Sequence, residues 1–376
     1  MNILIGGDLV VTDEYQGKNL FDPSVLNLFK ESDFRIINLE APITNNIAEN
    51  KIVKTGIHLR SSESTSAPFL KALNINLVTL ANNHILDYGE KGINDTLNFC
   101  KKYGLESIGS GNNLKDAQKS FRKEIKGIKI SIINFAENEW ASATSESAGS
   151  NPMELIDNVR QIELEKEVSD FVLVIIHGGN KSFSYPSPRM VKQYRFYADR
   201  GADIIVGHHP HCINGYEIYN KVPIFYSLGN FLFTKFSNQN SWYKGLVLKL
   251  KIDAVYGITF KLYPVEQDKQ TFKLKVLNGQ DEINMLQFLN HTNNVIQDSV
   301  KLMSLWAQFT KEKKNAYLMS ISPFSGIRNR YLKSFIYRSG LYKSFFQSRS
   351  KMQKLNMIRC EAHREALIEI LNNKTD

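Results

Sequence analysis

The sequence predicts an α/β sandwich followed by a helical, basic C-terminal appendage. Over residues 1–265, short apolar runs alternate with helix-like segments, as in sheets covered by helices. From about residue 280 the apolar residues change to helical spacing. Residues 301–376 carry 15 Lys and Arg against 5 Asp and Glu, whereas residues 1–300 carry 32 against 33. We therefore expect one domain over residues 1–275 and a basic helical module over residues 276–376.

The apolar runs of the first domain predict its strands. Six of them read as buried strands, at residues 2–5, 34–38, 76–80, 128–135, 171–176 and 203–206. Two later runs, at residues 223–226 and 246–252, suggest a more antiparallel half.

Two helices between these strands carry clear sequence signals. Ser66-Ala67-Pro68 resembles a helix N-terminus, with a serine cap before an early proline. Residues 89–103 place apolar side chains on one helical face, and Gly104 is expected to end that helix.

Composition excludes several classes of protein. The three cysteines lie far apart, which fits neither a disulfide framework nor a thiolate zinc site. The short apolar start has no basic leader, and no run of about 18 apolar residues exists. We therefore expect a cytoplasmic protein.

Polar side chains follow the predicted strands one after another. Ligands of open α/β sheets collect beyond the carboxyl ends of the strands. The residues found there are carboxylates, amides and imidazoles, the donors that Zn, Mn and Fe ions accept. They are Asp8, Glu40, Asn83, His84, His177, His208, His209 and His211.

Each of these residues taken alone has a simpler explanation. Asp8 could cap the next element, Asn83 could form a turn, and His177 could be a hydrogen-bonded core histidine. Five such strand ends together favour a metal site. One Asp, one Glu, one Asn and three His can surround two ions that share a carboxylate, and such a pair promotes phosphoryl displacement.

Several motifs resemble the CapA family, which is tied to bacterial capsule and poly-γ-glutamate synthesis and belongs to the calcineurin-like metallophosphoesterase superfamily. The resemblance spans residues 1–235 and implies an αββα sandwich of the metallophosphoesterase type. The motifs are Gly7-Asp8, Asn38-Leu39-Glu40-Ala41-Pro42, Ala81-Asn82-Asn83-His84, Ile85-Leu86-Asp87-Tyr88-Gly89, Gly201-Ala202-Asp203, Gly207-His208-His209-Pro210-His211 and Ser227-Leu228-Gly229-Asn230-Phe231.

The resemblance also implies a role for each site residue. One or two divalent ions (Mn, Zn or Fe) would be held by Asp8, Glu40, Asn83, His177, His209 and His211, with Glu40 bridging. His84 would face the substrate as general acid or oxyanion partner, and Asp87 would orient it. His208, Ser227 and Asn230 would support the site without binding metal, although residues 227–231 could equally be a plain glycine turn.

Two positions depart from the superfamily pattern. Val10 stands where the first motif usually has a histidine, which would remove one ligand from one metal position. Lys181 stands where the usual His-Trp-Gly-x-Glu motif has its glutamate, so the charge beside the expected site is reversed. This reversal could suit an anionic substrate or indicate lost activity.

The basic module has no counterpart in the resemblance. Residues 313–360 contain 11 Lys and Arg and no acid, interleaved with Tyr and Phe. This composition fits a solvated helical face, an anionic membrane surface, or an acidic polymer or synthase partner. Nucleic acid is disfavoured because no nucleic-acid motif accompanies the charge.

Two functions follow as hypotheses. The first is a metal-dependent hydrolase of phosphoesterase type that works in the synthesis of a surface polymer, with an anionic polymer or a phosphoester as substrate. The second is a non-catalytic accessory protein that keeps the fold and binds a polymer or scaffolds a synthase. The intact His84, Asn83, His209 and His211 favour the enzyme, whereas Val10 and Lys181 favour the accessory protein.

Overall fold

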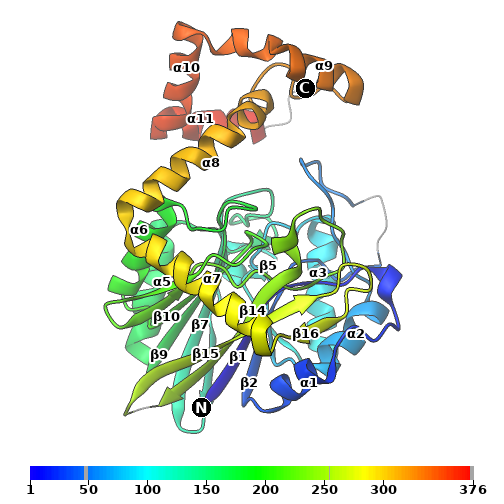
Figure 1. The fold of residues 1–376 in the computed structure, drawn as a ribbon, viewed down its shortest axis with the longest axis vertical. Helices are drawn as coiled ribbons and strands as arrows, with labels where there is room; N and C mark the ends of the chain where they lie inside the picture. The colour runs from blue at the N-terminus through cyan, green and yellow to red at the C-terminus, as the bar shows by residue number, and fades with distance from the viewer. Residues whose placement is uncertain (46–49, 254, 373–376) are drawn as a thin grey trace. The chain divides into compact units, whose positions relative to one another are not determined.

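The computed structural model describes residues 1–45, 50–253 and 255–372, and these residues form two compact units. The first unit is Met1–Met303 and the second is Ser304–Asp376. Figure 1 shows the first as a layered body of sheets and helices, and the second as a group of helices.

One sheet of the first unit is built around β1 (Asn2–Val10). Its strand order is β16-β15-β14-β1-β2-β3-β4, and β13 also pairs with β1. β1 to β4 and β13 run parallel, whereas β14, β15 and β16 pair antiparallel. The other strands are β2 (Phe34–Leu39), β3 (Leu77–Thr79), β4 (Glu106–Ile108), β13 (Asn230–Phe233), β14 (Lys244–Asp253), β15 (Gly257–Gln267) and β16 (Leu274–Val276).

The second sheet has the order β11-β12-β10-β9-β7-β6. Its central strands β7, β9, β10 and β12 are parallel, and β6 and β11 are antiparallel edges. These strands are β6 (Phe121–Ile125), β7 (Ile128–Ala136), β9 (Phe171–His177), β10 (Ile204–His208), β11 (Tyr216–Tyr219) and β12 (Val222–Phe225). A small third sheet pairs β5 (Ser110–Gly111) with β8 (Gly149–Ser150).

The two large sheets pack face to face because successive side chains of a strand point to opposite sides. Ile3 and Ile5 of β1 share a buried cluster with Leu173 of β9 and Val206 of β10, while Leu4 points to a second cluster. That second cluster is covered by the helices α1 (Pro23–Lys30), α2 (Glu63–Ala72) and α3 (Gly89–Lys102).

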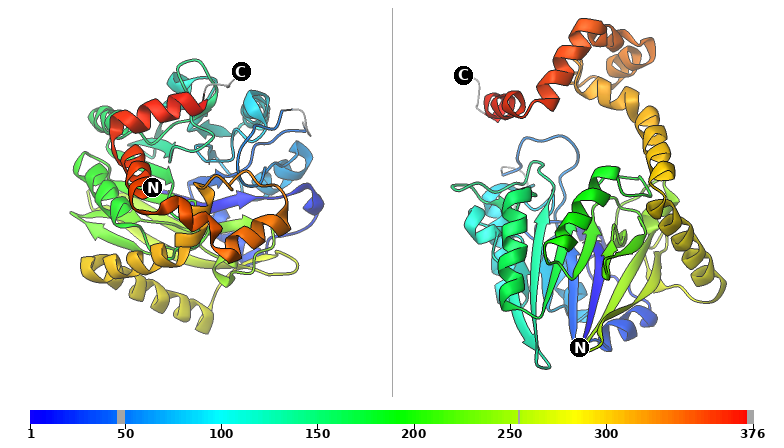
Figure 2. Two further views of the ribbon diagram at one scale, coloured as in Figure 1. Left: turned by 90° about the horizontal axis from the view of Figure 1, so that it is seen from above. Right: turned by 90° about the vertical axis from the view of Figure 1, so that its left-hand side faces the viewer.

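Helices α5 (Leu155–Val168) and α6 (Pro188–Asp199) contact the second sheet, and both lie on its outer side in Figure 2. The predicted αββα sandwich is therefore confirmed. The remaining short helices of the unit are η1 (Asp13–Tyr15), α4 (Leu114–Ala117) and η2 (Asn240–Tyr243).

Glycines let the segment between β12 and β13 pass close to β1 and β10 at the site edge. An added Cβ on Gly7 would lie 2.0 Å from the carbonyl oxygen of Gly229, and one on Gly207 would lie 2.1 Å from that of Tyr226. The backbone N–H of Asp8 donates to that Gly229 carbonyl. The register of β1 shifts on both sides of Asp8, so the strand bulges where its carboxylate enters the site.

The helical part of the chain begins where the sequence indicates, but the boundary between the units lies later. Helix α7 (Gly279–Gln297) packs on β11 and adds Met285 and Leu289 to the core between the sheets. Burying each of these side chains contributes about 1.5–3 kcal/mol, so α7 belongs to the first unit. The unit defined by contacts ends at Met303, and the domain division near residue 275 stays a prediction.

The second unit contains most of α8 (Ser299–Ser320), then α9 (Arg330–Ser339), η3 (Leu341–Phe346), α10 (Ser348–Arg359) and α11 (Glu361–Asn372). Its small core consists of Met319, Ile336 and Tyr342. Within the described ranges, no helix has both the length and the hydropathy needed to cross a membrane.

The start of α2 differs from the sequence prediction. The helix begins at Glu63, and the hydroxyl of Ser62 accepts the N-cap hydrogen bond from the Thr65 backbone. Ser66 and Pro68 are therefore inside the helix rather than at its start, because the earlier run of hydroxyl residues provides a cap one turn sooner.

Candidate metal centre

Six predicted ligands from five segments meet at one edge of the sandwich. They come from the ends of β1 and β9 and from the segments that follow β2, β3 and β10. All are buried: Asp8, Glu40, Asn83, His177, His209 and His211. The structure places these side chains close together, and their role as metal ligands stays a prediction.

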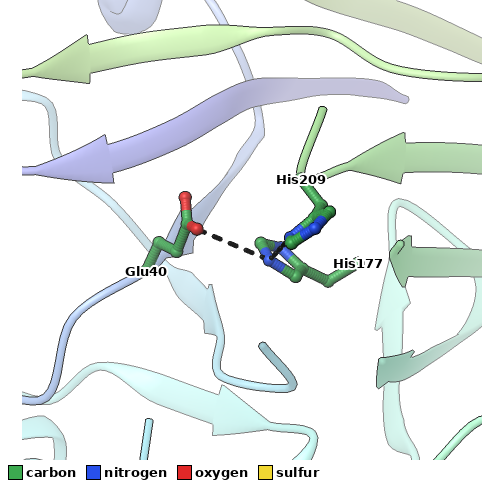
Figure 3. A group of neighbouring side chains, drawn as sticks. All are labelled: Glu40, His177 and His209. Atoms are coloured by element: carbon green, nitrogen blue, oxygen red, sulfur yellow. Dashed lines mark hydrogen bonds and ion pairs between the residues drawn. The ribbon is translucent and has the colours of Figure 1, made fainter. Parts of the chain in front are cut away.

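Glu40 occupies the centre of this cluster. Its Oε1 lies 3.5 Å from Nε2 of His177 and 3.6 Å from Nε2 of His211. Neither carboxylate oxygen has a hydrogen-bond partner among the described residues, although the side chain is fully buried. Burial, followed by the charge of Asp8, raises the pKa of Glu40 well above its usual value. Figure 3 shows the carboxylate pointing at the two imidazoles of His177 and His209.

The donor atoms form two groups that share Glu40. Glu40, His177 and His209 make one group, and Asp8, Glu40 and His211 make the other. Within each group the candidate donor atoms all lie within 4.8 Å of one another. Nitrogen and oxygen donors at this spacing suit borderline divalent ions such as Zn and Mn. The Glu40 carboxylate belongs to both groups and lacks a hydrogen-bond partner among the described residues. This is the position in which a ligand shared by two ions is expected.

Asp8 is fixed by contacts to both of its oxygens. The side-chain amide of Asn38 donates to Oδ1 at 2.6 Å, and the backbone N–H of His209 donates to Oδ2 at 3.3 Å. Burial alone would raise the pKa of Asp8, but the contact with His211, the charge of His208 and the Asn38 hydrogen bond together lower it. Asp8 therefore remains an anionic donor.

The imidazoles of His177 and His209 touch each other. Nε2 of His177 lies 2.9 Å from Nδ1 of His209 and 3.0 Å from Oδ1 of Asn83. Burial lowers the pKa of both rings well below the usual value. The charge of His209 lowers the pKa of His177 further, and the charge of Lys181 lowers that of His209 further. Neutral imidazole is the form that binds a metal ion.

The turn after β10 holds two histidines in an unfavourable backbone conformation. The φ angles of His209 and His211 are 97° and 57°, a region that non-glycine residues rarely occupy. Backbone strain of this kind costs on the order of 1–3 kcal/mol per residue and gathers at functional sites. Here it turns both imidazoles toward Asp8 and Glu40.

His84 lies beside the cluster and is held by Asp87. Its Nδ1 lies 2.7 Å from Oδ2 of Asp87, and the same carboxylate pairs with the ammonium of Lys54 and accepts the Leu59 backbone N–H at 2.6 Å. Burial lowers the pKa of His84 to about 4, even though Asp87 opposes this. The expected orienting contact between Asp87 and His84 is therefore present in the structure.

The three expected supporting residues also lie at the site. Nδ1 of His208 is 3.5 Å from Oδ1 of Asp8, and neither ring nitrogen has a hydrogen-bond partner among the described residues. Asn230 places its Oδ1 3.0 Å from Nδ1 of His211 and donates to the Trp242 carbonyl. Ser227 accepts the Gly229 backbone N–H and so shapes the turn rather than contacting a ligand.

Three residues of the site were not singled out from the sequence. Asn38 bridges Asp8 and Nδ1 of His177, at 2.6 and 3.3 Å. Glu139 accepts from Asn83 and lies 3.7 Å from Nε2 of His209. The strand-end argument, applied to β7, would have found Glu139. No sequence signal marks Lys54, which reaches the site from the loop before α2.

The two departures from the superfamily pattern have different structural settings. Val10 is buried in an apolar cluster with Ala41, Leu59 and Phe233, so the lost ligand position is filled by hydrocarbon. Lys181 is exposed, yet its charge lowers the pKa of His209 and opposes the upward pKa shift at Glu40.

The two packed sheets, with a buried carboxylate and imidazole cluster at the ends of their strands, define a metallophosphoesterase-like α/β protein. Residues 3–235 match the family of "Bacterial capsule synthesis protein PGA_cap". The chain belongs to this family, which confirms the resemblance seen in the sequence.

Two curated relatives carry related descriptions. The chain is 36% identical over 211 residues to "Capsule biosynthesis protein CapA" of Bacillus anthracis, covering 54% of this chain and 51% of the relative. It is 34% identical over 235 residues to "PGA biosynthesis protein CapA" of Bacillus subtilis, covering 62% and 61%. The matched region thus spans about half to three fifths of these relatives.

Solved structures show a looser likeness. A putative 5′-nucleotidase from Staphylococcus aureus aligns with a TM-score of 0.45 and 15% identity over 77% of this chain and 58% of that one. A phosphatase from Mycoplasma pneumoniae aligns with a TM-score of 0.44 and 14% identity over 72% and 95%.

Proposed function

We propose that this protein is a metal-dependent hydrolase of the phosphoesterase type that acts in the synthesis of a bacterial surface polymer. The observation that carries the proposal is the buried Glu40 carboxylate, which lacks a hydrogen-bond partner among the described residues and lies among four ligand-type side chains. A buried charge is retained at such cost only where something compensates it. The family description and the names of the relatives support the link to capsule or poly-γ-glutamate, and the choice between polyglutamate and polysaccharide is left to experiment.

The residues present fit divalent ions. Asp8, Glu40 and His211 would hold one ion, and Glu40, His177 and His209 would hold another, with Asn83 adding an amide oxygen near His177. Bound divalent ions supply Lewis-acid stabilisation of phosphoryl charge and activate water for attack.

The protein's own residues would orient the reaction. Asp87 fixes the His84 ring through Nδ1, so that Nε2 is the ring atom left to meet a substrate oxygen. Lys54 compensates the charge of Asp87 and holds this pair together. The exposed Lys181 adds positive charge beside the cluster, which favours an anionic substrate over a neutral one.

The test is hydrolysis of a generic phosphodiester by metal-loaded protein. We expect turnover by the wild type, and a rate roughly 10²–10⁴-fold lower in His84→Ala with its metal content unchanged, as for a positioned acid or base. His291→Ala, which removes an exposed histidine on α7, is the matched control. Loss of metal in His84→Ala would contradict the role assigned to this residue.

A non-catalytic accessory protein is the second candidate. The enclosed Val10 favours it, because one metal position lacks the histidine of the superfamily pattern. Metal binding without turnover of phosphodiester, phosphomonoester or amide substrates would support this candidate over the hydrolase.

A further inference from the structure

Helix α9 has a defined position in the second unit. The side chain of Asn329 caps its start by accepting the backbone N–H groups of Tyr331 and Leu332 at 3.0 and 3.1 Å. Gly340, with φ of 73°, ends it. Ile336 is buried against Met319 and Tyr342. The helix is thus held by the small core of its own unit, and the side chains it shows to solvent have a fixed arrangement.

The outer face of α9 carries aromatic side chains. Tyr331 is 72% exposed and Phe335 is 62% exposed. Residues four apart lie on the same side of a helix, so these two rings form one apolar strip. Arg338, three residues further on, falls on the same side and is also exposed. Leu332, the next residue of α9, is also exposed.

The stretch of sequence that contains α9 carries only positive charge. Residues 313–360 contain 11 Lys and Arg and no Asp or Glu. Within the described part of this stretch no basic side chain forms an ion pair, and the contacts that these side chains make are to neutral groups. Arg330 lies over the Tyr331 ring at 4.8 Å, and the ammonium of Lys333 donates to the Ser325 carbonyl at 3.4 Å.

We propose that this face of α9, formed by Tyr331, Phe335 and Arg338, docks on the surface of an anionic phospholipid bilayer, with Arg330, Lys333 and Lys343, which are near it in the sequence, adding positive charge. Exposed aromatic rings enter the headgroup region while neighbouring Lys and Arg meet lipid phosphates. The inference concerns the second unit alone and does not depend on the proposed hydrolase activity.

The apolar strip distinguishes a bilayer from other anionic partners. An acidic polymer in water would neutralise the bases but leave Tyr331, Leu332 and Phe335 in solvent, and a single-stranded nucleic acid could stack on the two rings but would leave Leu332 without an apolar partner. Docking on a bilayer uses both the positive charge and the apolar strip. The electrostatic contribution to binding should therefore weaken with salt, and the apolar contribution should persist.

The experiment measures sedimentation of the full chain with vesicles of phosphatidylcholine containing about 30% phosphatidylglycerol in about 0.1 M salt. We expect binding to these vesicles and little to pure phosphatidylcholine. Lys333→Glu/Arg338→Glu/Lys343→Glu should lower the partition coefficient by about 100-fold or more, since each base near the surface contributes about fivefold. Tyr331→Ser/Phe335→Ser should lower it by roughly tenfold, also at high salt.

Matched controls use equally exposed side chains of the first unit. Lys71→Glu/Lys115→Glu/Lys192→Glu makes the same change in net charge, and Val255→Ser/Tyr256→Ser removes side chains that are 82% and 86% exposed. Both controls should bind like the wild type, and circular dichroism should show all variants folded.

Three results would overturn the proposal. One is no binding of the wild type to anionic vesicles at low salt. Another is equal loss of binding in the test and control charge variants, which would indicate only net charge. The third is retention of an acidic polymer or RNA in place of vesicles, with Tyr331→Ser/Phe335→Ser unaffected, which would assign the face to a polyanion in solution.

Discussion

Replacing Glu40 by Gln should stabilise the metal-free protein and remove most of the stabilisation that bound metal gives. Glu40 is fully buried, its oxygens are without hydrogen-bond partners among the described residues, and Asp8 lies in the same cluster. An unsatisfied buried charge of this kind costs about 1–3 kcal/mol or more. The amide is nearly isosteric and uncharged, so Glu40→Gln should stabilise the metal-free protein, by less than this cost because the buried amide also lacks hydrogen-bond partners.

Bound metal should stabilise the wild type more than it stabilises Glu40→Gln. A ligand at a hundredfold excess over its Kd adds about 2.7 kcal/mol to the free energy of unfolding. The wild type should gain this with Mn²⁺ or Zn²⁺, whereas Glu40→Gln, which lacks the shared carboxylate, should gain little. Urea unfolding with chelator and with each metal measures both effects.

The control is Glu163→Gln, which removes an exposed carboxylate paired with Arg200. It should respond to metal like the wild type. A Glu40→Gln variant that is less stable than the wild type in chelator, and equally stabilised by metal, would refute the assignment of Glu40 as a ligand position.

Two further predictions concern the scaffold. Burial would raise the pKa of Glu165, but hydrogen bonds from Arg122 and Ser131 outweigh it and lower this pKa below 4.5. The ionised Glu165 therefore stabilises the fold above pH 4.5. This stabilisation is lost as the pH falls through the pKa of Glu165 in the folded protein. Glu165→Gln should cost about 1–3 kcal/mol at pH 7, with the difference from wild type vanishing in acid, as followed by urea unfolding across pH. Leu289→Ala should destabilise the first unit by about 2–5 kcal/mol because α7 belongs to its core; an unchanged unfolding midpoint of that unit would place α7 outside it.

Much of the sandwich could be predicted because its strands are continuous apolar runs bounded by polar residues. The central strands β7 and β9 were placed to within a residue or so. The full extent of β1 could not be predicted, since its last residues pair with β13, more than two hundred residues later, and with β2 beyond a register shift.

The same distinction applies to the site: some of its residues can be found from the local sequence, and others depend on contacts between distant parts of the chain. Glu40 and the histidines after β10 could be found from strand ends, because parallel strands deliver their termini to one edge. The ion pair of Lys54 with Asp87 depends on the path of a loop, and the strain at His209 and His211 depends on the tertiary contacts of the turn. Neither is encoded in a local pattern.

The later unit boundary has a similar cause. Residues 279–297 have helical spacing like the residues that follow, and the sequence therefore suggested a single appendage. What separates α7 from the rest is its partner surface: Met285 and Leu289 meet the core between the sheets, and the Asn293 side chain accepts the Tyr216 backbone N–H at 2.8 Å.

Elemental analysis of protein purified without chelator or a metal-affinity tag tests the central claim most directly. The account predicts one or two equivalents of Mn, Zn or Fe per chain in the wild type, and a clear loss in His209→Ala, which removes a donor from the group around Glu40. Protein that carries no divalent metal, even after incubation with Mn²⁺ or Zn²⁺, would contradict it.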